Sequence, residues 1–162
     1  MDIQIIKYHH QDLQNGVGIY FSFGADYQTR LASFNSSLQY LLRNLSPDIT
    51  LKPDFLYGVE ESETWFLAVS PAEGILGFGR LIHIERFEQS FGYLEDLVVR
   101  PEFRCRGLAT TIVQCIIEEA REKGHYKLML GCKPDKVEFY QQFGFAGGET
   151  SMRLNLINGG EA

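Results

Sequence analysis

Cysteine is scarce in this sequence, and its scarcity limits the chemistry. The 162 residues include three cysteines, Cys105, Cys115 and Cys132, an odd number with no C-x-x-C pair. Such a set supports neither a disulfide framework nor a zinc site built on paired cysteines. The four histidines show no metal-ligand spacing either. We therefore expect a protein of a reducing compartment that uses no metal.

Long apolar runs and an excess of positive charge are also missing. No run reaches the roughly 18 apolar residues of a membrane span. The first residues, MDIQIIKYHHQDLQ, lack the basic start and apolar stretch of a signal peptide. The net charge of −6 argues against a general nucleic-acid binder. These absences predict a cytoplasmic protein without a nucleic-acid or membrane partner.

What is present is typical of one folded domain over residues 1–162, with 44% hydrophobic and 13% aromatic residues. Strands grouped before the main helix predict an α+β sheet. In the main helix, charged residues that include Glu119 are expected to face solvent. The last strand before the final helix is expected to be buried. Apolar periodicity and turn residues predict strands at 2–9, 64–70, 74–86, 91–99, 126–132 and 151–157, the second to fourth as an antiparallel meander, and helices at 31–45, 106–123 and 134–144.

The segment RCRGLAT, residues 104–110, joins a predicted strand to a predicted helix. A helix N-terminus has free backbone N–H groups and a partial positive charge, which suit phosphate. Gly107 allows close backbone approach, and Arg104 and Arg106 can add charge-assisted bonds to a pyrophosphate. Solvated arginines before an amphipathic helix explain the same residues equally well. The segment alone leaves both interpretations open.

Two motifs resemble those of the GNAT superfamily of N-acetyltransferases. R-x-x-G-x-A, from Arg104 to Ala109, is similar to its acetyl-CoA loop, and KVEFYQQFGF, residues 136–145, is similar to its N-x-x-F-Y-x-x-x-G-F pattern. Within the superfamily, GRLIHIERF, YLEDLVV and HYKLMLGC most resemble the glucosamine-6-phosphate N-acetyltransferases. The resemblance covers residues 63–157. It implies a mixed, mostly antiparallel sheet of six to seven strands with helices on both faces.

The resemblance implies that acetyl-CoA is the co-substrate. Its pantetheine arm would pair with the backbone of Leu97, Val98 and Val99 as an added strand, which requires a splayed or bulged sheet edge. Its pyrophosphate would lie on the segment between Arg104 and Thr110. The members of that segment are Arg104, Cys105, Arg106, Gly107, Leu108, Ala109 and Thr110.

Tyr140 is the predicted general acid, protonating the departing coenzyme A thiolate. Glu95 and Asp96 are candidate acceptor-binding residues. Because they are adjacent in a strand, we expect their side chains on opposite faces, so that only one serves the site. Glu95 is our candidate base, with Asp96 or a water chain as alternatives. Cys132 has no histidine spaced to activate it, so direct attack by the amine is favoured over a covalent intermediate.

Three further positions differ from the family pattern or extend it. Gly131 stands where the amino-sugar enzymes carry an aspartate that meets the sugar, and Lys136 stands where they carry an asparagine that bonds the pantetheine arm. In the amino-sugar family an arginine near the position of Arg153 reaches a substrate phosphate, sometimes across a homodimer interface, and an exposed sheet arginine explains Arg153 equally well. We predict an acetyl-CoA-dependent N-acetyltransferase acting on a small primary amine. A non-catalytic acetyl-CoA-binding module and an enzyme acting on peptide amines are the alternatives.

Overall fold

The computed structural model describes residues 2–9, 27–48, 50–51, 62–148, 151–152 and 154. The chain divides into two compact units, Met1–Leu130 and Gly131–Ala162, and each is described on its own. None of the helices in the described ranges is both long and apolar enough to cross a membrane.

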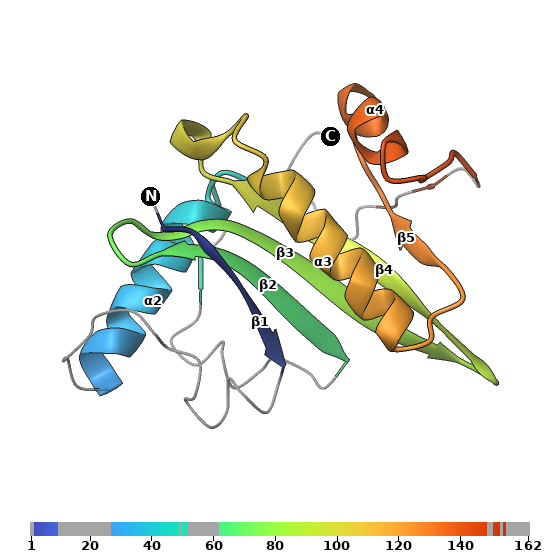
Figure 1. The fold of residues 1–162 in the computed structure, drawn as a ribbon, viewed down its shortest axis with the longest axis horizontal. Helices are drawn as coiled ribbons and strands as arrows, with labels where there is room; N and C mark the ends of the chain where they lie inside the picture. Colours follow the sequence, from blue (N-terminus) through green and yellow to red (C-terminus); the bar gives the residue numbers. More distant parts are fainter. Residues whose placement is uncertain are drawn as a thin grey trace. The chain divides into compact units, whose positions relative to one another are not determined.

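The first unit is built on one sheet with the strand order β1-β2-β3-β4-β5 (Figure 1). The first four strands pair antiparallel and β5 pairs parallel to β4. This confirms the predicted meander and the mixed, mostly antiparallel sheet. The strands are β1 Gln4–His9, β2 Glu63–Ser70, β3 Gly74–Arg86, β4 Gln89–Val99 and β5 Leu128–Leu130.

Two helices cover opposite faces of this sheet. Helix α2, Tyr27–Leu42, buries Phe34, Leu38 and Leu41 in a core cluster that includes Phe78 of β3. Helix α3, Leu108–Glu122, lies along the other face, as Figure 1 shows. Since neighbouring residues of a strand point to opposite faces, Phe78 contacts α2 while Gly79 lies under α3.

Glycine in β3 lets α3 approach the sheet closely. A Cβ built on Gly79 would lie 2.7 Å from Ile112 and 3.1 Å from Ile116, and one on Gly77 would lie 2.9 Å from Ile112. Both isoleucines are fully buried. Gly77 and Gly79 are therefore required for the close packing of α3 on β3.

Several details differ from the sequence-based expectations. Leu45 lies beyond the end of α2 and is exposed, because the helix ends at Leu42 in a turn. Glu119 does not face solvent: its side chain is 2% exposed, with Lys7 Nζ at 2.7 Å from Oε2. Strand β5 is half-buried and only three residues long.

The expected C-terminal strand is not seen in the part of it that the structure describes. Ser151, Met152 and Leu154 are exposed and adopt no regular structure, and the other residues of 151–157 lie outside the described ranges. The sheet of the described residues therefore has five strands, against the six to seven expected.

The second unit carries a 3₁₀ turn, Pro134–Lys136, followed directly by helix α4, Val137–Gln141. This matches the short helix predicted from residue 134. Its aromatic side chains pack edge to face, with ring centroids 5.4 Å apart for Phe139 and Phe143 and 5.9 Å apart for Tyr140 and Phe145. These contacts orient the side chains of a helix too short to be stable by itself.

Candidate active site

A β-bulge interrupts β4 at the position where the sequence predicts cofactor pairing. Arg80 pairs with Glu95 and Phe78 pairs with Val98, so two residues of β4 oppose Gly79 alone. Asp96 adopts a left-handed conformation with φ 56°. A non-glycine residue held in this region is strained, and such strain is concentrated at functional sites.

The other edge of β4 is unpaired beyond the bulge. The pairing of β4 with β5 ends at Leu94 and Leu130. Within the described part of the first unit, the edge from Glu95 to Val99 has no strand partner on the β5 side. Backbone groups on such an edge are available to an extended ligand that adds itself as a strand. The predicted bulged edge is thus present.

The bulge also brings two carboxylates to one guanidinium. Arg80 Nη2 lies 3.1 Å from Glu95 Oε2 and 2.8 Å from Asp96 Oδ2. The expectation that these adjacent side chains point to opposite faces is wrong, because the left-handed residue breaks the strand alternation. Both carboxylates are therefore available on one side of the sheet.

Arg80 was not identified from the sequence, although a signal was present. It is a charged residue within an otherwise apolar stretch, GILGFGRLI, of a strand that is largely buried. Its other terminal nitrogen lies 2.9 Å from Glu63 Oε1, and Glu63 Oε2 accepts a 3.0 Å hydrogen bond from the Trp65 indole. A lone arginine at an interior strand position predicts carboxylate partners on neighbouring strands.

The segment between β4 and α3 is anchored by its arginines and one aromatic ring. Phe103 is buried, with the guanidinium carbons of Arg100 and Arg106 each 5.1 Å from its ring centroid. Arg104 Nε donates to the Val99 carbonyl at 3.1 Å. Both arginines predicted to hold pyrophosphate remain exposed. The loop is therefore held to the end of β4, and its charge still faces solvent.

The start of α3 has the backbone geometry that an anion site requires. Cys105 and Gly107 have φ values of 56° and 81°, both left-handed. Gly107 is the N-cap, and no side chain caps the helix. Leu108 is buried, while Ala109 and Thr110 are half-buried. Left-handed residues before an uncapped helix leave backbone N–H groups free for an anionic ligand.

In the second unit, Tyr140 is half-buried among aromatic rings. Burial, with a further contribution from Cys132, raises the pKa of its phenol above 10.0. The hydroxyl is therefore protonated at neutral pH, as a general acid must be.

The remaining predicted positions of this unit are exposed. They are Gly131, Cys132 and Lys136, whose ammonium contacts Asp135 Oδ2 at 2.6 Å. The Lys136 contact lowers the pKa of the Asp135 carboxyl. Arg153 lies outside the described residues.

A chain of histidines on the α3 face of the sheet was assigned no role from the sequence. His83 Nδ1 and His125 Nε2 are 2.7 Å apart. Thr64 Oγ1 lies 2.8 Å from His83 Nε2, and Ser90 Oγ lies 2.8 Å from His125 Nδ1. Burial lowers the pKa of His83 to about 4, with the charges of His125 and Lys123 as further causes. These imidazoles are neutral at pH 7. In the described ranges, no three His, Cys, Asp or Glu residues are grouped to hold a metal.

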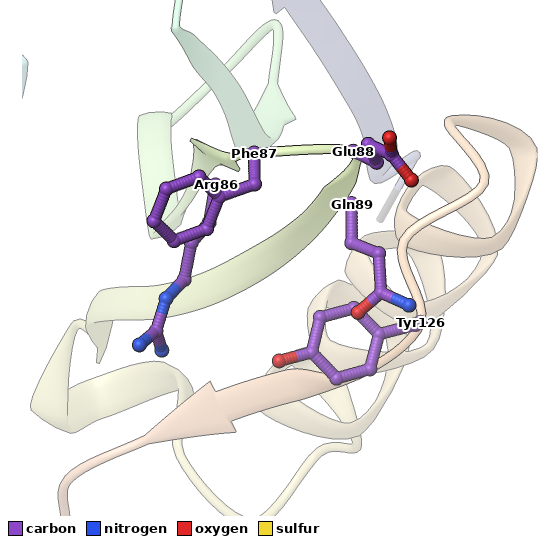
Figure 2. A pocket seen from close by; sticks show the side chains of 5 residues that line it. All are labelled: Arg86, Phe87, Glu88, Gln89 and Tyr126. Carbon is purple, nitrogen blue, oxygen red and sulfur yellow. The ribbon is translucent and has the colours of Figure 1, made fainter.

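A hollow of about 380 Å³ lies at the β3–β4 turn. Arg86, Phe87, Glu88, Gln89 and Tyr126 line it, as Figure 2 shows. None of the predicted site residues lines it. The open β4 edge, not this hollow, is therefore the candidate site.

Comparison with known proteins identifies the family of this chain. The model of the acetyltransferase (GNAT) family matches residues 30–145. The chain belongs to the GNAT family. The matched residues include the bulged strand β4, the loop before α3, and helix α4. The loop and the start of α3 carry the first sequence motif, and α4 lies within the second.

Curated relatives of this GNAT chain include amino-sugar enzymes. A glucosamine 6-phosphate N-acetyltransferase from Trypanosoma brucei brucei is 34% identical over 89 residues, which cover 53% of this chain and 60% of that protein. Another from Oryza sativa subsp. japonica is 38% identical over 63 residues, 39% of this chain and 38% of that protein. The chain thus spans between 38% and 60% of the length of these relatives.

Solved structures confirm the α+β GNAT fold. A Trypanosoma brucei acetyltransferase has a TM-score of 0.73 at 24% identity, covering 96% of this chain and 100% of that one. An aminoglycoside acetyltransferase from an uncultured soil metagenomic sample has a TM-score of 0.68 at 13% identity, covering 96% and 95%. At these identities the likeness concerns the fold alone.

Proposed function

We propose that this GNAT protein transfers the acetyl group of acetyl-CoA to a primary amine of a small molecule. The observation that carries the proposal is the unpaired β4 edge from Glu95 to Val99, which contains the bulge at Asp96 and is followed in the chain by the uncapped start of α3. An extended arm on that edge and a pyrophosphate on the helix start match the two chemical parts of coenzyme A.

In the proposed reaction the acceptor nitrogen attacks the thioester carbonyl carbon directly. A backbone N–H near Leu97 would stabilise the oxyanion. The C–S bond then breaks, Tyr140 donates its phenolic proton to the leaving thiolate, and the acceptor nitrogen gives up a proton to Glu95, directly or through water. Arg80 Nη2 binds Glu95, and this ion pair fixes the position of the proposed base.

An amino sugar phosphate is the proposed acceptor class, since curated relatives are named glucosamine 6-phosphate N-acetyltransferases. Gly131 removes the carboxylate that the family pattern has there, so the contacts to the sugar must differ in this chain. The same departure favours a test against other amines, including a peptide N-terminus.

The proposal is tested by the release of free coenzyme A thiol in mixtures of the protein, acetyl-CoA and one amine. The amines are glucosamine 6-phosphate, glucosamine, an aminoglycoside and an N-terminal peptide. We expect turnover with at least one small amine and a fall of about a hundredfold in kcat for Tyr140→Phe. Calorimetry should show unchanged acetyl-CoA affinity in that variant.

Two results would contradict the proposal. Tight acetyl-CoA binding without turnover of any amine would favour the non-catalytic binding module. Turnover of the peptide alone would move the acceptor to protein amines. Unchanged kcat in Tyr140→Phe would remove Tyr140 from the mechanism while leaving the activity in place.

A further inference from the structure

We propose that Arg80 is the positioning residue for the acceptor side of the site, gathering Glu95 and Asp96 beside the bulge to receive the acceptor ammonium. The inference rests on the proposed function and concerns a residue outside both the acetyl-CoA loop motif and the KVEFYQQFGF motif. Arg80 lies on β3 directly opposite Glu95 of β4 and beside Trp65 of β2.

Arg80 binds one carboxylate that is shielded from solvent and two that are more exposed. Its inner nitrogen Nη1 binds Glu63, whose side chain is 15% exposed and is held by the Trp65 indole. Its outer nitrogen Nη2 binds Glu95 and Asp96, whose side chains are 43% and 38% exposed. The inner contacts fix the guanidinium, and the outer contacts hold the two accessible carboxylates.

Each outer carboxylate keeps a second oxygen for a ligand. Arg80 contacts Glu95 through Oε2 and Asp96 through Oδ2. Within the described ranges, the structure gives no partner to Glu95 Oε1 or Asp96 Oδ1. A bound ammonium has three N–H donors and no acceptor, so it matches a pair of carboxylate oxygens.

The charge of the group favours the same ligand. The three carboxylates of Glu63, Glu95 and Asp96 share the single guanidinium of Arg80, so three negative charges against one positive leave −2. A cationic amine is attracted to such a group, and an anionic group is repelled. The acceptor should therefore enter with its ammonium end toward Glu95 and Asp96.

The bulge depends on the same contact. Aspartate at a left-handed φ of 56° is strained, and the 2.8 Å ion pair to Arg80 opposes the relaxation of that residue. Were residue 96 extended, its side chain would point to the other face, away from Glu95. Arg80 thus links the acceptor carboxylates to the local backbone shape that places both side chains on one face of the sheet.

The test compares Arg80→Met and Arg80→Lys with the wild type, and uses Arg86→Met as the matched control. Arg86 is an exposed arginine on the same strand. We expect Arg80→Met to lower kcat/KM for glucosamine 6-phosphate about tenfold to a hundredfold, mainly through KM. Calorimetry should give an acetyl-CoA Kd within about threefold of wild type, and Arg80→Lys should recover part of the loss.

A double-mutant cycle separates positioning from an independent role. In an Asp96→Asn background, which keeps a residue tolerant of positive φ, Arg80→Met should cost at least about threefold less than it does in the wild type. An equal cost in both backgrounds would overturn the proposal. So would an equal loss of acetyl-CoA affinity and acceptor kcat/KM, or an unchanged KM in both Arg80 variants.

A second readout keeps this inference separate from the proposed function. The NMR coupling between the amide and α protons of Asp96 reports its φ without any substrate. Arg80→Met should shift that coupling toward the extended value, and Arg86→Met should not. If the wild type acetylates no amine, the proposed function fails; a coupling unchanged in Arg80→Met would then also refute Arg80 as the residue that holds the bulge.

Discussion

The neutral pair of His83 and His125 should make the stability of this protein fall in mild acid. The folded protein holds the pKa of His83 at about 4, against 6.5 for an ordinary histidine. The pKa of His125 is lowered too, mainly by burial. A group with a depressed folded pKa binds fewer protons than it does in the unfolded chain. Stability is therefore full above the unfolded pKa and is lost as the pH falls from about 6.5 toward 4.

The size of the effect follows from the shift of His83. A change in the pKa from 6.5 to about 4 corresponds to a loss in the free energy of unfolding of at most ~3.4 kcal/mol below pH 4 and ~2 kcal/mol at pH 5. His83 is only half-buried, so solvent screening reduces this contribution, and we expect ~1 kcal/mol at pH 5. Replacement by glutamine removes the titration and keeps a hydrogen-bonding side chain for Thr64.

The assay is urea unfolding of the wild type and His83→Gln at pH 7.5 and pH 5. The single tryptophan, Trp65, is buried and reports unfolding by its fluorescence. The wild type should lose about 1 kcal/mol more than the variant between the two pH values, because other titrating groups are common to both. Equal losses in the two proteins would refute the assignment of His83 as a half-buried histidine that the fold keeps neutral.

Three further predictions concern the sheet and one of its turns, and each is tested by urea unfolding at pH 7.5. Gly79→Ala should destabilise the fold by about 1–3 kcal/mol, because its Cβ would meet Ile112 at 2.7 Å; a neutral result would mean that α3 shifts freely. Lys7→Met should cost more than Glu119→Gln, since it leaves the carboxylate of a 3% exposed residue without its nearest cation, and the reverse order would contradict the buried pair. Phe87→Asn should stabilise the fold by about 0.5–1 kcal/mol, because Phe87 is 98% exposed with φ 55° in a two-residue hairpin turn; destabilisation would contradict a ring that makes no stabilising contact.

The parts of the fold that local patterns determine were predictable from the sequence. Apolar runs and turn residues predicted β2, β3 and β4 within two residues of their ends, and apolar periodicity predicted α3 within two residues of its ends. Gly107 was predicted to allow close approach of the backbone to a ligand, and in the structure it has a left-handed φ of 81°, which glycine adopts without strain. Each of these features depends on neighbours close in the chain.

Features that depend on contacts between distant segments were missed. The burial of Glu119 results from Lys7, 112 positions away in the sequence, and no pattern within the helix indicates it. The shared face of Glu95 and Asp96 results from a bulge whose aspartate carries no conformational signal of its own. The rule that neighbouring side chains of a strand point to opposite faces fails wherever a bulge adds a residue to the strand, and such bulges are common beside active sites.

The histidine chain shows the same limitation. His83 and His125 are 42 positions apart, yet the β3–β4 pairing and the turn after α3 bring their nitrogens to 2.7 Å. A search for metal-ligand spacings in the sequence does not detect two histidines that contact each other. Their neutrality is a property of the assembled sheet face.

The central claim is that acetyl-CoA binds along the open edge of β4 with its pyrophosphate at the start of α3. Calorimetric titration with acetyl-CoA tests it most directly, in the wild type, in Arg104→Ala plus Arg106→Ala, and in Arg86→Ala as control. We predict saturable binding to the wild type and control, weakened about tenfold or more in the double variant. Absence of binding by the wild type, or equal affinity in all three proteins, would contradict the account.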